Sequence, residues 1–516
     1  MKLPESDPTG FRGRFLREEE ARRPFQEASG ILRLLPDAVA VPEDAADVAA
    51  LVRWAAETRT PLVPRGAGTG MPGGNVGRGV SVDLVTRFRG VEAVDPEARL
   101  ARVLPGTTRV ELNAACVPYG LHFPVDPSSG ARATLGGIIA NNSAGSHSVK
   151  YGAAREWVEA LELVLADGTP ASVARGREPE EPRLRSIVGR LRRELLPRCA
   201  RIEARWPRVR KNSSGYALRE FLRSGDAADL LVGSEGTLAL ITAATVRLAP
   251  LPAAVGLAVL EFTRLEAAGA AVETILQHDP ATCEILDRTF LDLVRSGGED
   301  PGYPLRPGLE ALLLVEVERG SAGEVEAALE GLRTALGGLA DRMVVTADEA
   351  EQERLWQVRH AASPLIAARA DGRVSMQFIE DGVVPVSRLP DYVAVLRRTL
   401  ERHGLPAVIF GHAGDGNLHV NPLVDVTHPG WQREIEEMVF EIAEAVAALG
   451  GTMAGEHGDG RLRAPVLETI WGREMVALFR RVKEAFDPRG ILNPGVILPL
   501  PGQRPLDALG EYLAPA

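Results

Sequence analysis

Three of the nine histidines lie in two glycine-rich stretches toward the C-terminal end of the chain. The first stretch, FGHAGDGNLHVN, carries His412 and His419 at either end of a glycine-rich turn. The second, GEHGDG, places Glu456 directly before His457. Two imidazoles and one carboxylate are a common ligand set for Zn²⁺ or a similar divalent ion. The pattern therefore predicts a metal site at His412 and His419, for which Glu456 could supply the carboxylate.

The same histidines could instead be satisfied inside their loops by Asp415 and Asp459, as a single loop histidine commonly is. Glycine in regular structure costs roughly 0.5–1 kcal/mol of stability relative to alanine. Stability therefore does not explain so many glycines around these histidines, and the cluster favours a set of metal ligands. If the chain is extended after His419, the two-residue period of a strand directs His419 and Asn421 to the same side.

A long glycine-rich stretch, Pro124–Gly152, must position this chemistry. It reads PVDPSSGARATLGGIIANNSAGSHSVKYG, and between its ends only Asp126, Arg132 and Lys150 are charged. Glycine lets backbone N–H groups approach a ligand closely, and successive N–H groups form anion-binding concavities. The stretch is typical of backbone wrapped around a large, flat, phosphorylated cofactor, although a glycine-rich surface loop is the alternative.

Two shorter fragments support the cofactor interpretation. The stretch 59–83, RTPLVPRGAGTGMPGGNVGRGVSVD, has seven glycines after a short apolar run. A dinucleotide fingerprint needs a helix directly after such glycines, and Pro72 with its two following glycines would break one. We therefore predict a phosphate-binding loop between strands rather than a Rossmann turn. The fragment 233–242, GSEGTLALIT, is the third member of the set.

The totals restrict the class of protein. A chain of 516 residues is expected to form two or three domains, and a net charge of -11 argues against nucleic acid or an anionic membrane as its main ligand. We expect neither a transmembrane helix nor a secretory signal, because the required apolar spans are missing. Three isolated cysteines, Cys116, Cys199 and Cys283, offer no CxxC motif. A reduced, cytosolic protein without its own iron–sulfur cluster is expected.

The order of predicted elements changes near residues 249–253, APLPA, which we interpret as a linker. Before it, short strands alternate with helices, including a helix 108–119 ended by Gly120 and a hairpin at Asp167-Gly168. After it, two strand–helix–strand units predict a mainly antiparallel sheet with helices on one face. Longer helices are predicted at 349–369, 432–449 and 468–486.

The motifs resemble a known pair of domains. In their order and separation, the three glycine-rich fragments resemble the FAD-binding domain of the vanillyl-alcohol oxidase superfamily over roughly residues 35–250. The H-x-G-D-G-N-L-H-x-N and GEHGDG patterns, with the ending FDPRGILNPGV, resemble the C-terminal FAD-linked oxidase domain over residues 251–498. That family includes D-lactate, D-2-hydroxyglutarate and glycolate dehydrogenases.

The resemblance implies an α+β fold with a two-subdomain FAD-binding domain, an antiparallel-sheet cap that forms the substrate domain, and a C-terminal helical segment that returns to the FAD domain. We therefore divide the chain into an N-terminal helical extension, the FAD-binding domain, the cap and the C-terminal segment that completes the active site. Their predicted bounds are 1–35, 36–250, 251–450 and 451–516.

Roles are carried over to matching positions only. The resemblance makes His412, His419 and Glu456 the metal ligands and His457 the catalytic base. Asn421 becomes a substrate contact. Arg359 becomes the holder of the substrate carboxylate, helped by a small hydroxyl at Ser363. The residues assigned to FAD are Pro64, Arg65, Gly66, Ala67, Gly68, Thr69, Gly70, Pro127, Ser128, Thr134, Gly136, Gly137, Asn141, Ser143, Ala144, Gly145, Tyr151, Gly152, Glu235, Gly236, Thr237, Ile241 and Asn493.

Two departures from the family pattern matter. Some members tether FAD to a histidine in the first glycine loop, where this chain has Thr69, so we expect non-covalent FAD. Hydroxyglutarate enzymes carry a lysine in the stretch that here reads QFIED, Gln377–Asp381, which puts hydroxyglutarate in doubt. This stretch also resembles larger bacterial relatives that carry an appended iron–sulfur domain.

The expected activity is oxidation of a D-2-hydroxy acid to the 2-oxo acid, by metal-assisted proton abstraction and hydride transfer to flavin N5. The ion is expected to be zinc, with manganese or iron as alternatives. The electron acceptor stays open between oxygen, a quinone, an electron-transfer flavoprotein and an iron–sulfur subunit. A homodimer and peripheral attachment to the inner face of the membrane also stay open. The rival functions are a non-catalytic or electron-relay FAD subunit and a flavoenzyme like alkyl-glycerone-phosphate synthase.

Overall fold

The computed structural model describes residues 3–297, 302–360 and 373–510. Its N-terminal part contains a four-stranded sheet in the order β1-β2-β4-β3. Strands β2, β4 and β3 are parallel, and β1 is antiparallel to β2. Helix α2 connects β2 to β3, and its N-cap Asp44 accepts a hydrogen bond from the backbone of Asp47. The elements are β1 (Arg14–Leu16), β2 (Ala38–Val41), α2 (Ala45–Thr58), β3 (Leu62–Arg65) and β4 (Val80–Asp83).

The first glycine-rich fragment lies where the sequence predicts it. Residues 66–79 connect the neighbouring parallel strands β3 and β4, and within this fragment the structure forms no helix. Pro72 and the glycines around it prevent a helix from starting at this point. The loop between strands is therefore confirmed.

A five-stranded antiparallel sheet, in the order β5-β6-β10-β8-β9, forms the second layer of the N-terminal part. Its strands are β5 (Val91–Asp95), β6 (Leu100–Val103), β8 (Val158–Leu165), β9 (Pro170–Ala174) and β10 (Ala239–Arg247). Helices α3 (Arg109–Cys116), α4 (Leu135–Asn141), α5 (Ser148–Tyr151), α6 (Ala154–Trp157), α7 (Pro182–Leu195), α8 (Cys199–Arg205), α9 (Leu218–Ser224) and α10 (Ala228–Leu231) accompany it. The hairpin at Asp167-Gly168 is confirmed by the pairing of β8 with β9.

The long glycine-rich stretch is not one continuous loop. It contains α4 and the single-turn α5. The apolar run Leu135–Ile139 buries three of its side chains against the five-stranded sheet, and Asn142 ends the helix with a φ of 51°. Burial of this run outweighs the low helix propensity of Gly136 and Gly137.

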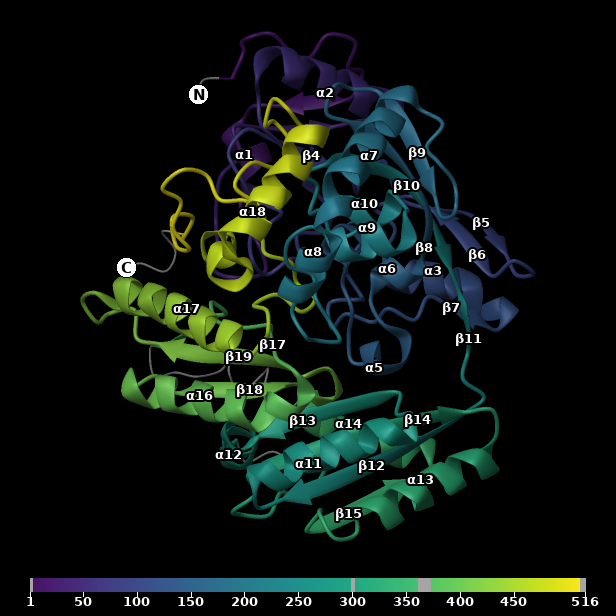
Figure 1. Ribbon diagram of the computed structural model, residues 1–516, viewed down its shortest axis with the longest axis vertical. Coiled ribbons are helices and arrows are strands. Elements are labelled where there is room, and N and C mark those ends of the chain that lie inside the picture. The colour runs from purple at the N-terminus through teal and green to yellow at the C-terminus, as the bar shows by residue number, and fades with distance from the viewer. Residues whose placement is uncertain (1–2, 298–301, 361–372, 511–516) are drawn as a thin grey trace.

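The third layer is a large antiparallel sheet in the order β15-β12-β14-β13-β18-β19-β16, with β17 paired to β19 (Figure 1). Its strands are β12 (Ala254–Phe262), β13 (Thr282–Asp287), β14 (Ala311–Arg319), β15 (Arg342–Thr346), β16 (Val374–Ser375), β17 (Gly382–Val383), β18 (Ala407–His412) and β19 (Asn417–Val424). Two short strands, β7 (Leu121–His122) and β11 (Ala249–Pro250), pair where the chain passes between the two parts.

Helices cover both faces of the large sheet, so the prediction of helices on one face is wrong in this detail. One face packs on α11 (Leu265–Ile275), α13 (Ala322–Leu336), α16 (Leu389–Arg402) and α17 (Trp431–Ala448). The other face packs on α12 (Arg288–Ser296) and α14 (Glu349–His360). The reason is visible in β14, where Leu312 and Leu314 face one core and Leu313 and Val315 face the other.

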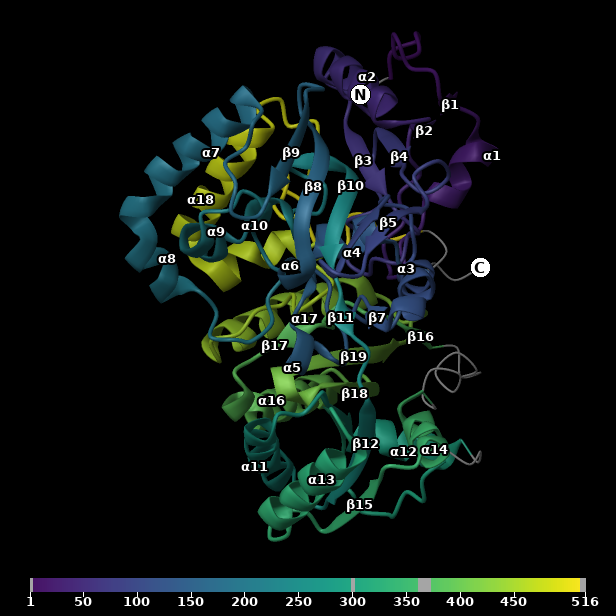
Figure 2. The ribbon, with the colours of Figure 1, turned by 90° about the vertical axis from the view of Figure 1, so that its right-hand side faces the viewer.

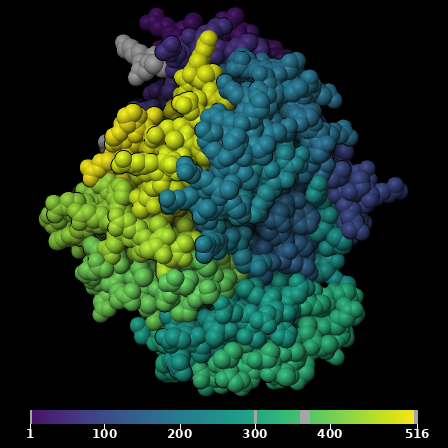
Figure 3. All heavy atoms as spheres, in the orientation of Figure 1, coloured from purple at the N-terminus to yellow at the C-terminus, as the bar shows by residue number. Residues whose placement is uncertain are grey.

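The C-terminal segment returns to the N-terminal part. Helix α18 (Leu467–Phe486), broken at Gly472, buries Trp471, Phe479 and Phe486 in the core of the five-stranded sheet. In two views at right angles it runs beside α7 (Figures 1 and 2). On the surface the C-terminal residues (yellow) lie directly against the blue surface of the N-terminal part (Figure 3).

The N-terminal extension is less helical than we predict from its sequence. It contains β1 and one turn of helix, α1 (Glu19–Arg22), followed by a 3₁₀ turn. Pro24 and the glycines at 10, 13 and 30 prevent a longer helix. None of the helices in the described part of the chain combines the length and the apolar character that crossing a membrane requires.

Candidate active site

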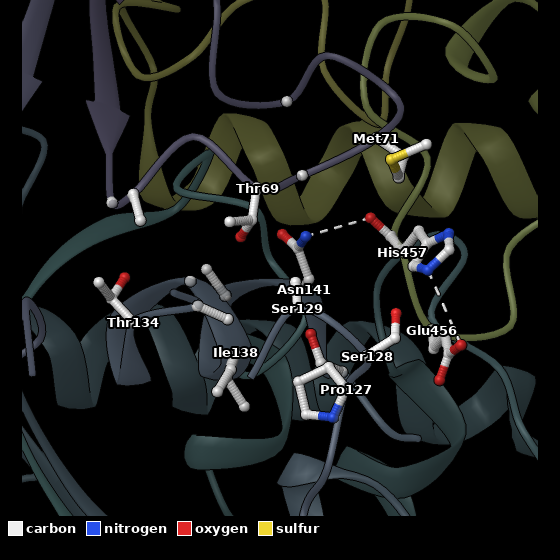
Figure 4. Close-up of a pocket in the computed structure, with 18 of the residues that line it drawn as sticks. Thr69, Met71, Pro127, Ser128, Ser129, Thr134, Ile138, Asn141, Glu456 and His457 are labelled. Carbon is white, nitrogen blue, oxygen red and sulfur yellow. Dashed lines mark hydrogen bonds and ion pairs between the residues drawn. The ribbon is translucent and has the colours of Figure 1, made fainter. Parts of the chain in front are cut away.

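A cavity of about 800 Å³ lies between the glycine-rich fragments and the large sheet (Figure 4). Seventeen of the residues assigned to FAD line it: Pro64, Arg65, Gly66, Ala67, Gly68, Thr69, Gly70, Pro127, Ser128, Thr134, Gly136, Gly137, Asn141, Ser143, Glu235, Gly236 and Ile241. We call these residues the glycine cradle. The other six assigned residues do not line the cavity: Ala144, Gly145, Tyr151, Gly152, Thr237 and Asn493.

Three of the six make side-chain hydrogen bonds that hold neighbouring segments, and Asn493 bonds to residues that line the cavity. The side chain of Asn493 donates to the carbonyls of Gly74 and Glu235, both at 2.8 Å. The Thr237 hydroxyl donates to the carbonyl of Ser234. The Tyr151 hydroxyl donates to Glu318 at 2.5 Å, which ties α5 to the large sheet.

The glycine cradle is built by close backbone approach. A Cβ on Gly66 would lie 2.3 Å from Thr134 Oγ1, and a Cβ on Gly236 would lie 2.2 Å from Pro64 Cγ. The φ of Gly236 is +68°, in the left-handed region. The buried Thr134 Oγ1 has no hydrogen-bond partner among the described residues. An unpaired buried hydroxyl in a backbone-lined cavity fits a polar cofactor such as FAD.

At the other end of the cavity, three predicted ligand atoms converge. His412 Nε2 lies 3.3 Å from His419 Nε2 and 3.2 Å from Glu456 Oε1, and His419 Nε2 lies 3.3 Å from Glu456 Oε1. Ligands at about 2.0–2.1 Å around a tetrahedral ion are about 3.3 Å apart. The donor set and its spacing therefore fit one divalent ion. We call His412, His419, Glu456 and His457 the histidine cluster.

Two carboxylates, one on a strand and one in the loop before β17, orient the two imidazoles. Glu284 on β13 accepts from His412 Nδ1 at 2.5 Å, which leaves Nε2 to face the cluster. Glu380 lies 3.4 Å from His419 Nδ1. Such partners fix the ring orientation of metal-binding histidines. Burial lowers the pKa of His412, but the Glu284 carboxylate outweighs it and raises that pKa to about 9.

His457 is held on the same side of the cavity. Its Nδ1 lies 2.9 Å from Glu380 Oε2, and its Nε2 lies 3.7 Å from Glu456 Oε1. Its backbone N–H donates to Asp381, and its carbonyl accepts from the Asn141 side chain at 3.1 Å (Figure 4). Burial lowers the pKa of His457, but Glu380 and Asp381 outweigh it and raise that pKa to about 9.

Arg359 also lines the cavity, from α14. Its Nε donates to Glu284 at 3.1 Å, and its guanidinium lies over the Phe410 ring at 4.4 Å from the ring centroid. Asn421 and His419 line the same cavity from β19, as the two-residue period predicts. Ser363 lies outside the described residues.

The alternative partners of the histidines do not contact them in the structure. Asp415 accepts from the Ser148 hydroxyl at 2.5 Å, and Asp459 accepts from the backbone of Gly215 at 2.7 Å. The carboxylates that contact the outer ring nitrogens of the histidines, Glu284 and Glu380, are not among the residues predicted from the sequence. The sequence does contain a signal for Glu284. Glu284 stands in the middle of the buried strand TCEILD, and a buried carboxylate in a strand needs a charged partner.

Comparison with known proteins identifies two families in the chain. Residues 36–173 match the family described as FAD binding domain, and residues 251–497 match FAD linked oxidases, C-terminal domain. Among solved structures, the fold is similar to a 4-ethylphenol oxidase from Gulosibacter chungangensis, with a TM-score of 0.65 at 17% identity and 94% of each chain covered. It is also similar to an alkyldihydroxyacetonephosphate synthase, with a TM-score of 0.61 at 17% identity, covering 93% of this chain and 82% of the other.

The relatives in sequence are closer. The D-2-hydroxyglutarate dehydrogenase of Escherichia coli K12 is 31% identical over 97% of this chain and 52% of its own length, so this chain spans about half of that protein. The glycolate oxidase subunit GlcD of Bacillus subtilis 168 is 32% identical, with 89% of this chain and 88% of the relative covered. With a relative at this identity covered almost throughout and two matching domain families in the expected order, the chain belongs to the FAD-linked oxidases.

Proposed function

We propose that this chain oxidises a D-2-hydroxy acid to the corresponding 2-oxo acid with FAD. The observation that carries the proposal is the convergence of His412, His419 and Glu456 at 3.2–3.3 Å beside His457, in the wall of the cavity that the glycine cradle also lines. The relatives named D-2-hydroxyglutarate dehydrogenase, D-lactate dehydrogenase and glycolate oxidase subunit support this reaction class.

The glycine cradle would hold FAD without a covalent bond. When bound, FAD supplies the two-electron acceptor. Thr69 stands where a tethering histidine could sit, so acid precipitation should release all the yellow colour into the supernatant. Flavin that stays with the precipitate would contradict non-covalent binding.

His412, His419 and Glu456 would hold one divalent ion, of which zinc is the first choice and manganese or iron the alternatives. When bound, the ion supplies a Lewis acid for the oxygens of the substrate. Metal analysis should find about one ion per chain, and chelation should abolish flavin reduction until Zn²⁺, Mn²⁺ or Co²⁺ is added back. A fully active metal-free preparation would contradict the metal site.

Two side chains of the cavity match the two functional groups of a 2-hydroxy acid. Arg359 would bind the carboxylate by its guanidinium, which suits planar anions. Without an ion, the raised pKa of about 9 keeps a proton on His457, and a cation bound at the neighbouring Glu456 would favour the neutral ring. The neutral His457 would take the hydroxyl proton at Nε2, because Glu380 occupies Nδ1. The same carboxylate stabilises the imidazolium that forms. Asn421 lies in the same cavity wall and would contact the substrate.

The test is anaerobic mixing of the FAD-loaded protein with a panel of D- and L-2-hydroxy acids, followed by flavin absorbance. We expect bleaching by D-lactate, glycolate or D-2-hydroxyglutarate, and slower or no bleaching by the L-enantiomers. Succinate and propionate, which lack the hydroxyl, serve as controls. A flavin that stays oxidised with every hydroxy acid, in a metal-replete protein, would contradict the proposal.

A further inference from the structure

A buried lysine lies behind the candidate metal ligand Glu456. Lys211 is 4% exposed, and its Nζ lies 2.8 Å from Glu456 Oε2, while Oε1 of the same carboxylate faces the two imidazoles. Neither Lys211 Nζ nor Glu456 Oε2 has a hydrogen-bond partner elsewhere among the described residues. The two oxygens of Glu456 are therefore directed to different tasks.

The pair repeats a pattern around the cluster. Glu284, which contacts His412, is paired with Arg359, and Glu380, which contacts His419, is paired with Arg463. Glu456 with Lys211 is the third such pair. Within the described part of the chain, each carboxylate that contacts His412 or His419 has a cation within ion-pairing distance. Three cations from three different segments thus balance three carboxylates.

We propose that Lys211 is a positioning residue. It restricts Glu456 to binding the metal ion through one oxygen, and it neutralises the charge of the Glu456 carboxylate. This inference rests on the metal site of the proposed function. Burying a lysine is costly unless its charge is compensated, and here the partner is the one anionic ligand of the set. With Lys211 in place, the ligand set of two neutral imidazoles and one charge-compensated carboxylate adds no net negative charge to a bound divalent ion. The ion would then present its full double positive charge to the substrate.

This arrangement suits a ligand with two negative oxygens, such as a 2-hydroxy acid that has lost its hydroxyl proton. An unbalanced Glu456 would bind the ion more strongly and leave less charge for such a ligand. Lys211 therefore lowers the affinity of the site for the metal and raises the affinity of the bound metal for the substrate. The two effects have opposite signs, which makes the role testable.

The experiment uses the FAD-loaded full chain, stripped of metal and titrated with Zn²⁺ in competition with a chromophoric chelator. Lys211→Met removes the charge in a side chain of similar length, and Lys211→Gln serves if the Met variant does not fold. Lys211→Arg keeps the charge. Lys150→Met is the matched control, because Lys150 is also paired with a buried glutamate, Glu318 at 2.8 Å, outside the cluster. Binding of oxalate, a doubly charged and unreactive chelator, is then measured on the Zn²⁺-loaded proteins.

We expect the neutral variants to bind Zn²⁺ about tenfold more tightly and oxalate at least about tenfold more weakly than the parent protein. Lys211→Arg and Lys150→Met should stay within about threefold on both measurements. A lysine that merely supports the local structure would instead loosen Zn²⁺ by roughly 10–100-fold on removal. Unchanged or weaker Zn²⁺ binding in the neutral variants would overturn the inference.

The failure of this inference and that of the proposed function are distinguishable. Parent protein that binds Zn²⁺ and oxalate, together with neutral variants that bind both equally well, overturns the role of Lys211 alone. Parent protein that binds no divalent ion overturns the metal site and the role of Lys211 together.

Discussion

The glycine cradle and the histidine cluster form two ends of one cavity by opposite means. The cradle brings backbone close to the ligand by omitting side chains, as the 2.2 Å approach at Gly236 shows. The cluster depends on charged side chains from distant segments, Glu284 on β13 and Glu380 in the loop before β17, which orient three imidazoles. FAD binding by the cradle should therefore be weakened by substitutions that add atoms. Metal binding by the cluster should be weakened by substitutions that remove a ligand or a charge.

The largest expected effect is at the cluster. His412→Ala removes one of three converging ligands, so the ion should be lost while FAD stays bound. A metal ion contributes several kcal/mol to such a reaction, so flavin reduction should slow by about 10³-fold or more. Metal content and flavin content on the same sample check this. A variant that loses FAD and keeps its metal would break the contrast between the two regions.

The reciprocal change is at the cradle. Gly236→Val places a Cβ against Pro64 and forces a β-branched residue into a left-handed conformation, which costs about 1–3 kcal/mol. We expect FAD affinity to fall by roughly 10–100-fold while Zn²⁺ binding is unchanged. Flavin fluorescence titration of the flavin-free protein measures the first, and chelator competition measures the second. Equal FAD affinity in parent and variant would show that the backbone contact is unimportant.

A smaller effect concerns pH. Glu235 belongs to the cradle, and burial, with the nearby Asp459, raises its pKa to about 8. The folded protein then holds a proton on Glu235 that the unfolded chain releases above about pH 4.5. This group should make stability fall as pH rises from about 4.5 to 8, by at most about 1.4 kcal/mol per pH unit, and have no further effect above pH 8.

Glu235→Gln removes this titration and keeps an oxygen for the backbone N–H groups of Asp459 and Gly460. Denaturant unfolding at pH 5, 6.5 and 8 should show a smaller loss of stability in the variant than in the parent. Parallel pH dependence in the two proteins would assign the loss to other groups.

The sequence predicts the ligands better than the residues that orient them. His412, His419 and Glu456 stand in two recognisable motifs, and the strand after Gly416 brings His419 and Asn421 to one face as expected. Glu284 lies 128 residues from His412. Its pairing follows from the neighbouring positions of β13 and β18, which local patterns do not encode.

The same limit applies to Lys211 and to the two-sided helix packing of the large sheet. Lys211 stands in the stretch RKNSSGY, which contains no recognisable metal-binding motif. Its partner Glu456 is 245 residues further along the sequence. For the large sheet, the continuous apolar run of β14 does indicate that both of its faces are buried. The prediction of helices on one face used only the order of strands and helices and took no account of this run.

The most direct test of the account is the reduction rate of the flavin in His457→Ala, measured by stopped flow with metal content determined on the same sample. If His457 is the base, the variant keeps FAD and metal, and reduction by a hydroxy acid slows by at least about a hundredfold. Reduction should show a primary isotope effect when C2 carries deuterium, because that bond breaks. Near-normal reduction in a metal-replete variant would contradict the role of His457 as the proton acceptor.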